Sequence, residues 1–389
     1  MCFLPIFPIV ASAVLFLSDK YKFDNPGAYI FASNGTLYMV FQYFSGIAAP
    51  GWCMLINVTV GSSFMFARPI IGQVLVGCMA IITGFYFYLL GATWEYSLLI
   101  SLILIAFTVL FSRSYSYLNL QQQKIQIKNK EIEAKNKDIT DSIHYAQKIQ
   151  QAVLPIEENI QRSVPLHFIL FKPKDIVSGD FYWFHEINSD EYIMICADCT
   201  GHGVPGAFMT VIGSNILNHI IIENKEYSPG KIIKQLDERI TTTLKQEKEK
   251  TIKVQDGMDC GVLYVHKKNR EFIYAGAKRS AYQISENVAS EIKSSKLSVG
   301  GLRSGEKIFE EVKKTFKPDD IIYLYTDGYA DQFGGEKSKK YSTKRLKEDL
   351  LKINEATLSE QKSKLEQNFM LWKNNLEQID DVCIIGIRF

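Results

Sequence analysis

Four aspartates stand at the ends of short apolar runs in the second half of the sequence. They are Asp180, before the aromatic run 181–184; Asp198, after the run 192–197; Asp327, after the run 321–325; and Asp380, before the run 382–385. Carboxylates gathered in one place repel one another, so they need a cation. Donor sets made only of oxygen favour a hard ion such as Mg²⁺ or Mn²⁺ over zinc. A single strand-end aspartate is common in turns, but four of them predict a metal site.

The runs around these aspartates have the composition of β-strands, and helical patterns lie between them. Strand-like runs rich in Ile, Val, Tyr and Phe cover 192–197, 261–265, 271–275, 321–325 and 382–387. Helical patterns cover 207–222, a segment that begins at Ser228-Pro229, and residues 357–377. The runs 261–265 and 271–275 are spaced like the two strands of a hairpin. We therefore expect an α/β sandwich with antiparallel sheets inside and helices outside.

The first 112 residues have a different composition, because they carry only six charged side chains. Four apolar segments, 2–17, 37–60, 70–91 and 96–112, have about the length that a membrane-spanning helix needs, roughly 20 residues. We therefore predict a multi-pass transmembrane helical domain over 1–112, in the inner or plasma membrane. Arg68 and Arg113 favour a cytoplasmic location for the rest of the chain. The net charge of +2 argues against a nucleic-acid surface.

A polar connector, residues 113–155, follows the predicted membrane domain. Apolar residues recur in it every seven positions, at Leu118, Ile125, Ile132, Ile139, Ala146 and Val153. The second set of heptad positions is mostly polar, at Gln122, Asn129, Asn136, Ile143 and Gln150. This pattern predicts a helix that pairs weakly with a second copy as a coiled coil, giving a homodimer. The alternative is a single solvated helix, and in either case Leu154-Pro155 ends it.

Six short motifs follow one another in the C-terminal part of the chain. They are KPKDIVSGDFY at 172–182, ADCTGHGVPGA at 197–207, DGMD at 256–259, YAGA at 274–277, YTDG at 325–328 and QIDDV at 378–382. Together with the preceding helix 143–155, this series resembles the SpoIIE/RsbU-type protein phosphatases. The resemblance implies a PP2C-like β-sandwich flanked by helices over 156–389. It also implies metal-dependent removal of phosphate from phosphoserine or phosphothreonine.

By this resemblance, Asp198 bridges two Mn²⁺ or Mg²⁺ ions, and Asp180 and Asp327 each complete a metal shell. A water that bridges two hard cations loses a proton more readily and attacks phosphorus in line. The cations also neutralise the charge on the equatorial phosphate oxygens. This chemistry needs no enzyme nucleophile, so Cys196 and Cys199 need not be catalytic.

The resemblance assigns the other ligands with less precision. The backbone carbonyl of Cys199 takes the place that follows the bridging aspartate. Asp380 matches the last ligand, and its neighbour Asp381 is the alternative. Asp256 and Asp259 are candidates for a third, weakly held ion, and the alternative is that they form a turn.

Groups that would bind phosphate or move a proton are harder to identify. No arginine stands out as a phosphate ligand, so Lys172 or Lys174 is the candidate, with a solvated lysine as the alternative. His202 is a candidate proton donor to the leaving serine oxygen, although it equally suits the turn before a helix. Gly334-Gly335 and the lysines that follow predict an exposed loop suited to an acidic partner.

The sequence therefore predicts a membrane-anchored protein phosphatase that is controlled by its membrane and coil segments. Its substrate would be a separate phosphorylated protein, such as an anti-anti-sigma factor of the STAS type, as the resemblance implies. A rival hypothesis is a membrane receptor that binds a phosphoprotein without hydrolysing it. A metal-dependent nucleotide hydrolase is a third hypothesis, disfavoured because no phosphate-binding glycine loop is present.

Overall fold

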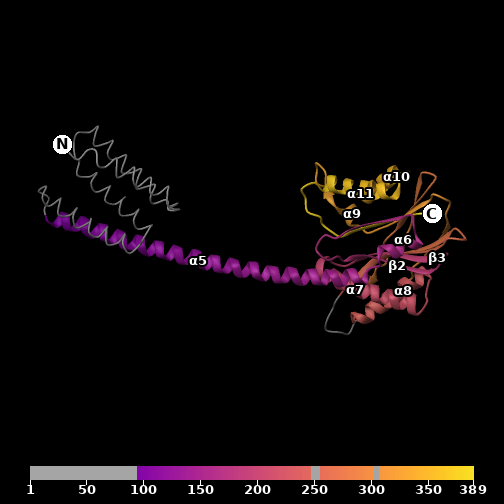
Figure 1. Cartoon of the computed structure of the whole chain (residues 1–389), viewed down its shortest axis with the longest axis horizontal. Helices are drawn as coiled ribbons and strands as arrows, with labels where there is room; N and C mark the ends of the chain where they lie inside the picture. Colours follow the sequence, from indigo (N-terminus) through magenta and orange to yellow (C-terminus); the bar gives the residue numbers. More distant parts are fainter. Residues whose placement is uncertain (1–93, 247–254, 302–305) are drawn as a thin grey trace. The chain divides into compact units, whose positions relative to one another are not determined.

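The computed structural model describes residues 94–246, 255–301 and 306–389 (Figure 1). The predicted membrane segments 2–17, 37–60 and 70–91 lie outside these residues. The chain divides into two compact units, Met1–Ala134 and Lys135–Phe389. Of the helical segments whose residues are all described, Gly203–Glu223 is long and apolar enough to cross a membrane. Half of its apolar window is buried, as in the core helix of a globular domain.

The second unit contains two antiparallel sheets. One has the strand order β2 (Asp180–Asn188), β3 (Glu191–Cys199), β4 (Gly257–His266), β5 (Glu271–Ala277) and β9 (Glu311–Thr315), with β8 (Val299–Gly300) beside β4. The other has the order β1 (His167–Lys172), β13 (Val382–Arg388), β10 (Ile321–Tyr325), β6 (Ala281–Ser285) and β7 (Val288–Ile292). A small hairpin pairs β11 (Phe333–Gly334) with β12 (Lys339–Lys340).

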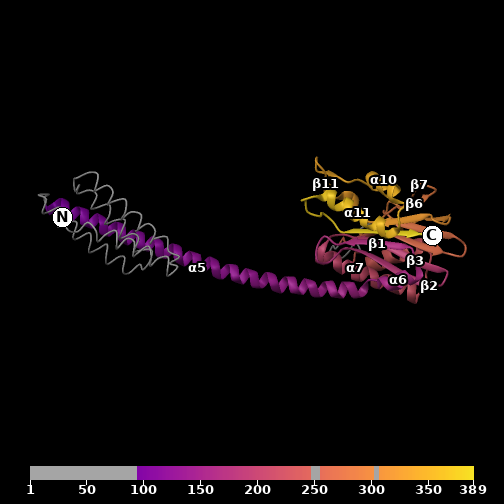
Figure 2. The same cartoon turned by 45° about the horizontal axis from the view of Figure 1, so that its top comes forward.

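Helices cover the outer faces of both sheets. They are α7 (Gly203–Leu217) with its π-helical continuation η1 (Asn218–Glu223), α8 (Pro229–Thr243), α9 (Gly328–Asp331), α10 (Thr343–Ile353) and α11 (Leu358–Lys373). The short helix α6 (Glu157–Ser163) instead packs its Ile160 into the core between the sheets. Figure 1 shows α7 and α8 on one side of the sheets, and α10 and α11 on the other. Figure 2 shows α7 and α10 on opposite sides in the turned view. The domain is thus a four-layer sandwich of helices, two sheets and helices.

Side chains of β3 show how the sandwich is assembled. Ile193, Ile195 and Ala197 pack in the core under α7 and α8. Tyr192 and Met194 pack in the core between the two sheets. Successive strand residues point to opposite faces, so a strand buried on both faces has to be apolar throughout, as this one is. A third core fills the space between the second sheet and α10 and α11.

The strands and helices predicted for the C-terminal part are confirmed in type, and their ends differ by a few residues. The loop predicted at Gly334-Gly335 is instead part of the short hairpin of β11 and β12. The strand predicted at 321–325 is β10, and the hairpin of 261–265 with 271–275 is the β4–β5 pair. The helix predicted from Ser228-Pro229 is α8, which has its proline in the first turn. The last helix has a capping box, in which Thr357 and Glu360 satisfy each other's backbone N–H groups.

The connector is part of one long helix, α5 (Trp94–Val153). It ends directly before Leu154-Pro155, where the sequence predicts its end, because proline cannot continue a helix. The seam residues Leu118, Ile125 and Ile132 are more than half exposed in this single chain. A helix that leaves such a stripe uncovered is suited to pairing with another helix.

Candidate metal centre

Three aspartates form a row across neighbouring strands of the first sheet. Asp180 is paired with Asp198 in the register of β2 and β3, and Asp198 is paired with Asp259 in the register of β3 and β4. Directly opposed residues of antiparallel strands point to the same face. That face is the one between the two sheets, because Met194 and Cys196 on β3 lie in the inter-sheet core. The inter-sheet core thus ends in a row of carboxylates.

The second sheet brings two further aspartates to the same end of the sandwich. Asp327 follows β10 and is the N-cap of α9, and Asp380 lies just before β13. The two chain segments approach closely, since a Cβ on Gly328 would lie 1.9 Å from the carbonyl oxygen of Asp381. A glycine after Asp327 is therefore needed to bring these two strand ends together.

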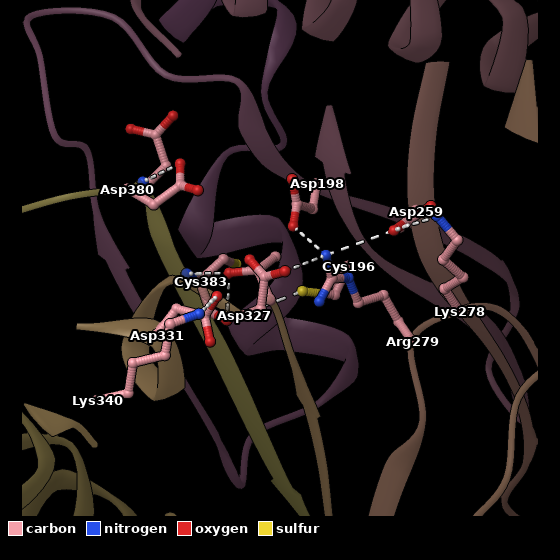
Figure 3. Close-up of polar contacts among 12 residues, drawn as sticks. Cys196, Asp198, Asp259, Lys278, Arg279, Asp327, Asp331, Lys340, Asp380 and Cys383 are labelled. Carbon is pink, nitrogen blue, oxygen red and sulfur yellow. Dashed lines mark hydrogen bonds and ion pairs between the residues drawn. The ribbon is translucent and has the colours of Figure 1, made fainter. Parts of the chain in front are cut away.

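The Arg279 guanidinium lies in the middle of this cluster (Figure 3). Its Nη2 is 2.5 Å from Asp198 Oδ2, 2.7 Å from Asp327 Oδ2 and 3.5 Å from Asp259 Oδ2. The side chain is 15% exposed, and its Nε has no hydrogen-bond partner. Arg279 is therefore the cation that balances part of the carboxylate charge, a role that the sequence analysis did not assign to it.

The loop that carries Arg279 holds its backbone firmly. The Tyr274 hydroxyl donates a 2.5 Å hydrogen bond to the Arg279 carbonyl, and Lys278 N donates to the Ser295 carbonyl at 2.8 Å. Lys278 has a φ of 53°, a left-handed conformation that costs energy in a residue other than glycine. The cue in the sequence was the pair Lys278-Arg279 directly after the YAGA motif, at the end of a buried strand.

The electrostatics show that the cluster is short of positive charge. Burial, and then the charge of Asp198, raises the pKa of Asp180 well above its usual value. Burial also raises the pKa of Asp198 to about 8, although Arg279 opposes the shift. Asp180 Oδ2 is buried without a hydrogen-bond partner. A buried, unpaired carboxylate oxygen is costly unless a cation or a proton satisfies it.

The donor set fits a hard divalent cation. All five aspartate side chains are oxygen donors, which Mg²⁺ and Mn²⁺ prefer. Among the described residues, no three acidic, cysteine or histidine side chains already converge closely enough to hold an ion. Arg279 contacts oxygens of both Asp198 and Asp327, so it would compete with a cation for these oxygens.

Asp381 has a different environment from Asp380. Its side chain is buried, and it accepts backbone hydrogen bonds from Lys174 N and Gly179 N, each of 2.7 Å. It therefore fastens the loop that leads into Asp180. Asp380 is the more accessible of the pair, and burial raises its pKa, with a smaller contribution from Asp327. The geometry thus favours Asp380 as the member that faces the cluster.

The other residues singled out from the sequence lie around the cluster. Asp256 lies directly before β4 and accepts a 3.1 Å hydrogen bond from the Thr200 hydroxyl, whereas Asp259 lies within β4 and joins the carboxylate row, so the two do not form a turn. The thiol of Cys199 lies in the core under the helices, where burial raises its pKa. Lys172 forms an ion pair with Glu366 at 2.9 Å.

His202 is at the centre of an exposed chain of three polar groups. Its Nδ1 is 2.7 Å from Asp175 Oδ2, and its Nε2 is 2.9 Å from Lys174 Nζ. His202 also acts electrostatically on Asp380, which places it beside the cluster. The sequence placed His202 and Lys174 in separate motifs, and the fold brings them into contact.

The long helix reaches the cluster through one side chain. Gln150 is buried, its Nε2 donates to the Ser178 carbonyl at 2.5 Å, and its Oε1 accepts from Ser178 N at 3.1 Å. The Thr210 hydroxyl on α7 also lies 3.1 Å from the Ser178 carbonyl. Since Ser178 is two residues before Asp180, this amide clamp joins α5 to the carboxylate row.

The family model of stage II sporulation protein E (SpoIIE) matches residues 188–389. The chain belongs to the SpoIIE family. Phosphoserine phosphatase RsbP of Bacillus subtilis (strain 168) is 23% identical over 159 residues, which are 40% of this chain. The match spans 37% of RsbP, well under two thirds of that protein.

Among solved structures, the SiaA-PP2C domain of Pseudomonas aeruginosa superposes with a TM-score of 0.59 and 31% sequence identity. The match covers 65% of this chain and 98% of that domain. The C-terminal unit of this SpoIIE-family chain therefore has the PP2C fold, and the sequence prediction of that fold is confirmed.

Proposed function

We propose that the chain is a metal-dependent phosphatase that removes phosphate from phosphoserine or phosphothreonine on a separate protein. The observation that carries the proposal is the row Asp180, Asp198 and Asp259, completed by Asp327 from the facing sheet. The similarity to a protein named phosphoserine phosphatase supports the same reaction. Five aspartates gathered at one end of the two sheets repel one another, and a domain that only binds a phosphoprotein has no need of them, so the receptor hypothesis is the weaker one.

In this proposal the side chains of Asp180, Asp198, Asp327 and Asp380 and the carbonyl of Cys199 hold two ions. Asp198 takes the bridging position, and Asp259 is the candidate for a third, weak site. When bound, two Mn²⁺ or Mg²⁺ ions supply an activated water and neutralise phosphate charge. With the carboxylates held by cations, the Arg279 guanidinium would be released from them and would be suited to binding phosphate oxygens.

His202 and Lys174 are the groups suited to handling the proton of the leaving serine. Asp175 accepts from His202 Nδ1, which leaves Nε2 directed at Lys174. A histidine oriented by a carboxylate is a suitable proton carrier near neutral pH. We propose that this pair delivers the proton to the serine oxygen as the phosphorus–oxygen bond breaks.

Membrane anchoring and pairing through the coil form the second part of the proposal. At the start of α5 the large apolar side chains Leu99, Leu102, Ile103, Val109 and Leu110 are at least half exposed. Such a surface suits lipid better than water. The exposed seam farther along α5 supports a homodimer. We place the catalytic domains in the cytoplasm because of Arg68 and Arg113, and we propose an anti-anti-sigma protein of the STAS type as the substrate class from the family resemblance.

The decisive test is phosphate release by the full-length chain in detergent, from p-nitrophenyl phosphate and from a phosphoserine protein. We expect release with Mn²⁺, none with chelator, and a loss of at least a hundredfold in Asp198→Asn. The Asp256→Asn variant is the matched control, since Asp256 lies directly before β4, outside the carboxylate row. Metal-dependent phosphoprotein binding without turnover would instead establish the receptor hypothesis.

A further inference from the structure

A strongly basic hairpin projects from the domain beside the carboxylate cluster. This basic hairpin, residues 333–345, comprises β11, its turn, β12 and the start of α10, and it carries five basic residues and one acidic residue. Lys337, Lys339 and Lys344 are exposed and have no ion pair with another described residue. Phe333 is 40% exposed on the same hairpin. Unpaired cations beside an exposed aromatic side chain are suited to binding an acidic protein surface.

The backbone at the base of the basic hairpin is held against α11 by hydrogen bonds and close packing. Gly335 N donates a 3.0 Å hydrogen bond to the Trp372 carbonyl on α11, and the Trp372 indole N–H donates to the Gln332 carbonyl at 3.0 Å. A Cβ on Gly334 would lie 1.9 Å from the same Trp372 carbonyl. The Arg345 guanidinium stacks over the Trp372 ring at 4.2 Å. A preorganised surface binds with less loss of entropy than a mobile loop.

The hairpin also lies next to the catalytic carboxylates. Asp331 N donates to the Asp327 carbonyl at 2.8 Å, so Asp331 is one helical turn beyond Asp327. Lys340 on β12 forms a 2.8 Å ion pair with Asp331. Figure 3 shows this pair in the same close-up as Asp327 and Asp380. A partner that docks on the hairpin therefore places its neighbouring residues at the metal centre.

We propose that the basic hairpin is the docking surface for the phosphatase's own protein substrate, and that it selects a phosphoserine flanked by acidic side chains. The inference rests on the proposed function, and it specifies that the substrate carries negative charge around its phosphoserine. Charge complementarity and the position one turn from Asp327 both favour this partner over a remote one.

The test uses two phosphoserine peptides that differ only in flanking residues, with Asp and Glu in one and Asn and Gln in the other. The full-length chain in detergent is compared with K337E/K339E, which leaves the Lys340 and Arg345 contacts intact. We expect the wild type to prefer the acidic peptide at least tenfold in kcat/KM, mainly through KM. In K337E/K339E this preference falls to about one or below, and hydrolysis of p-nitrophenyl phosphate stays within twofold.

A matched control changes the same amount of charge elsewhere. Lys268 in the β4–β5 turn and Lys364 on α11 are exposed, and neither has an ion pair among the described residues. The K268E/K364E variant should keep the peptide preference. The inference is overturned if both double variants lose the preference for the acidic peptide equally, or if K337E/K339E keeps that preference. Unchanged preference is also the result expected if the hairpin instead contacts anionic lipid.

A binding measurement separates this inference from the proposed function. The probe is the acidic peptide with a non-hydrolysable phosphonate and a fluorescent label, followed by anisotropy. Binding to the wild type that weakens at least tenfold in K337E/K339E supports docking even if no substrate is turned over. Absence of hairpin-dependent binding overturns the docking surface, whatever the activity on p-nitrophenyl phosphate.

Discussion

Arg279 determines how much negative charge the aspartate cluster presents to a cation. One guanidinium nitrogen contacts Asp198 and Asp327 within 2.7 Å, yet the pKa of Asp198 still rises to about 8. The charge is therefore only partly balanced. An arginine and a divalent cation that use the same carboxylate oxygens compete for them, so metal affinity and apo-protein stability are linked through this residue.

Replacing Arg279 with glutamine should lower the stability of the metal-free protein and tighten its binding of Mn²⁺. We expect a loss of about 2 kcal/mol, or about 5 °C in Tm, because buried carboxylates lose their partner. Arg279→Lys keeps the charge and is the matched control. Thermal melts with and without metal, with calorimetric titration of Mn²⁺, check both effects. Weaker metal binding by the glutamine variant would contradict the competition.

His167 gives the domain a pH dependence that is separate from the metal centre. Burial lowers its pKa, against the opposing effects of its hydrogen bond to the Val164 carbonyl and of Glu157, while Lys362 adds a small lowering effect. At this position the unfolded chain therefore binds more protons at mildly acidic pH, and the contribution of His167 to the free energy of unfolding falls as pH drops below about 6.5. His167→Asn cannot be protonated at this position. Its free energy of unfolding by denaturant should therefore fall less from pH 7 to pH 5 than that of the wild type. An equal fall would contradict this account.

The aspartates could be predicted from the sequence, whereas the position of Arg279 after the YAGA motif was only a weak cue that did not indicate its contacts. Asp180, Asp198 and Asp327 stand at the ends of recognisable strands, so pattern alone indicates a common edge. Arg279 reaches the cluster because a loop held by Tyr274 turns it there, and such a turn depends on contacts made only in the folded chain. The same reason explains why Asp259 and Asp256 were indistinguishable in sequence although the fold separates them.

Among the elements, α5 makes the contact that periodicity does not predict. Gln150 occupies a seam position of the coil, but it is buried against the Ser178 backbone. The strands and helices themselves follow from apolar pattern and caps, which are local signals. The clamp is a long-range contact between a helix and a loop. A polar residue at a heptad position does not indicate from the sequence which distant segment it will contact.

Replacing Gln150 with alanine should weaken metal binding through the Ser178–Asp180 loop. Two backbone hydrogen bonds at a buried site are lost, which should cost about 1–3 kcal/mol of stability. Gln151 is exposed on the same helix, so Gln151→Ala is the matched control. Calorimetric titration with Mn²⁺ should show a several-fold loss of affinity in Gln150→Ala alone. Equal affinity in the two variants would mean that the clamp is structural and does not position Asp180.

At the scale of the whole molecule, the heptad seam changes its partner along α5. Leu118, Ile125 and Ile132 are exposed. Gln150, in contrast, is buried against Ser178 of the C-terminal domain, and Val153 is partly buried. The first part is therefore available to a second copy, and the last part is already used. A helix engaged in this way can pass a change in pairing to the Asp180 loop.

Replacing Ile132 with glutamate should separate the two copies and change phosphatase activity. A charge in a seam opposes pairing, and we expect the dimer dissociation constant to rise at least tenfold. Ile127 is 66% exposed and lies off the seam, so Ile127→Glu is the matched control. Light scattering of the detergent-solubilised chain measures the assembly, and phosphate release per chain measures its effect. If Ile132→Glu becomes monomeric with unchanged activity, the coil joins the copies without controlling the metal centre.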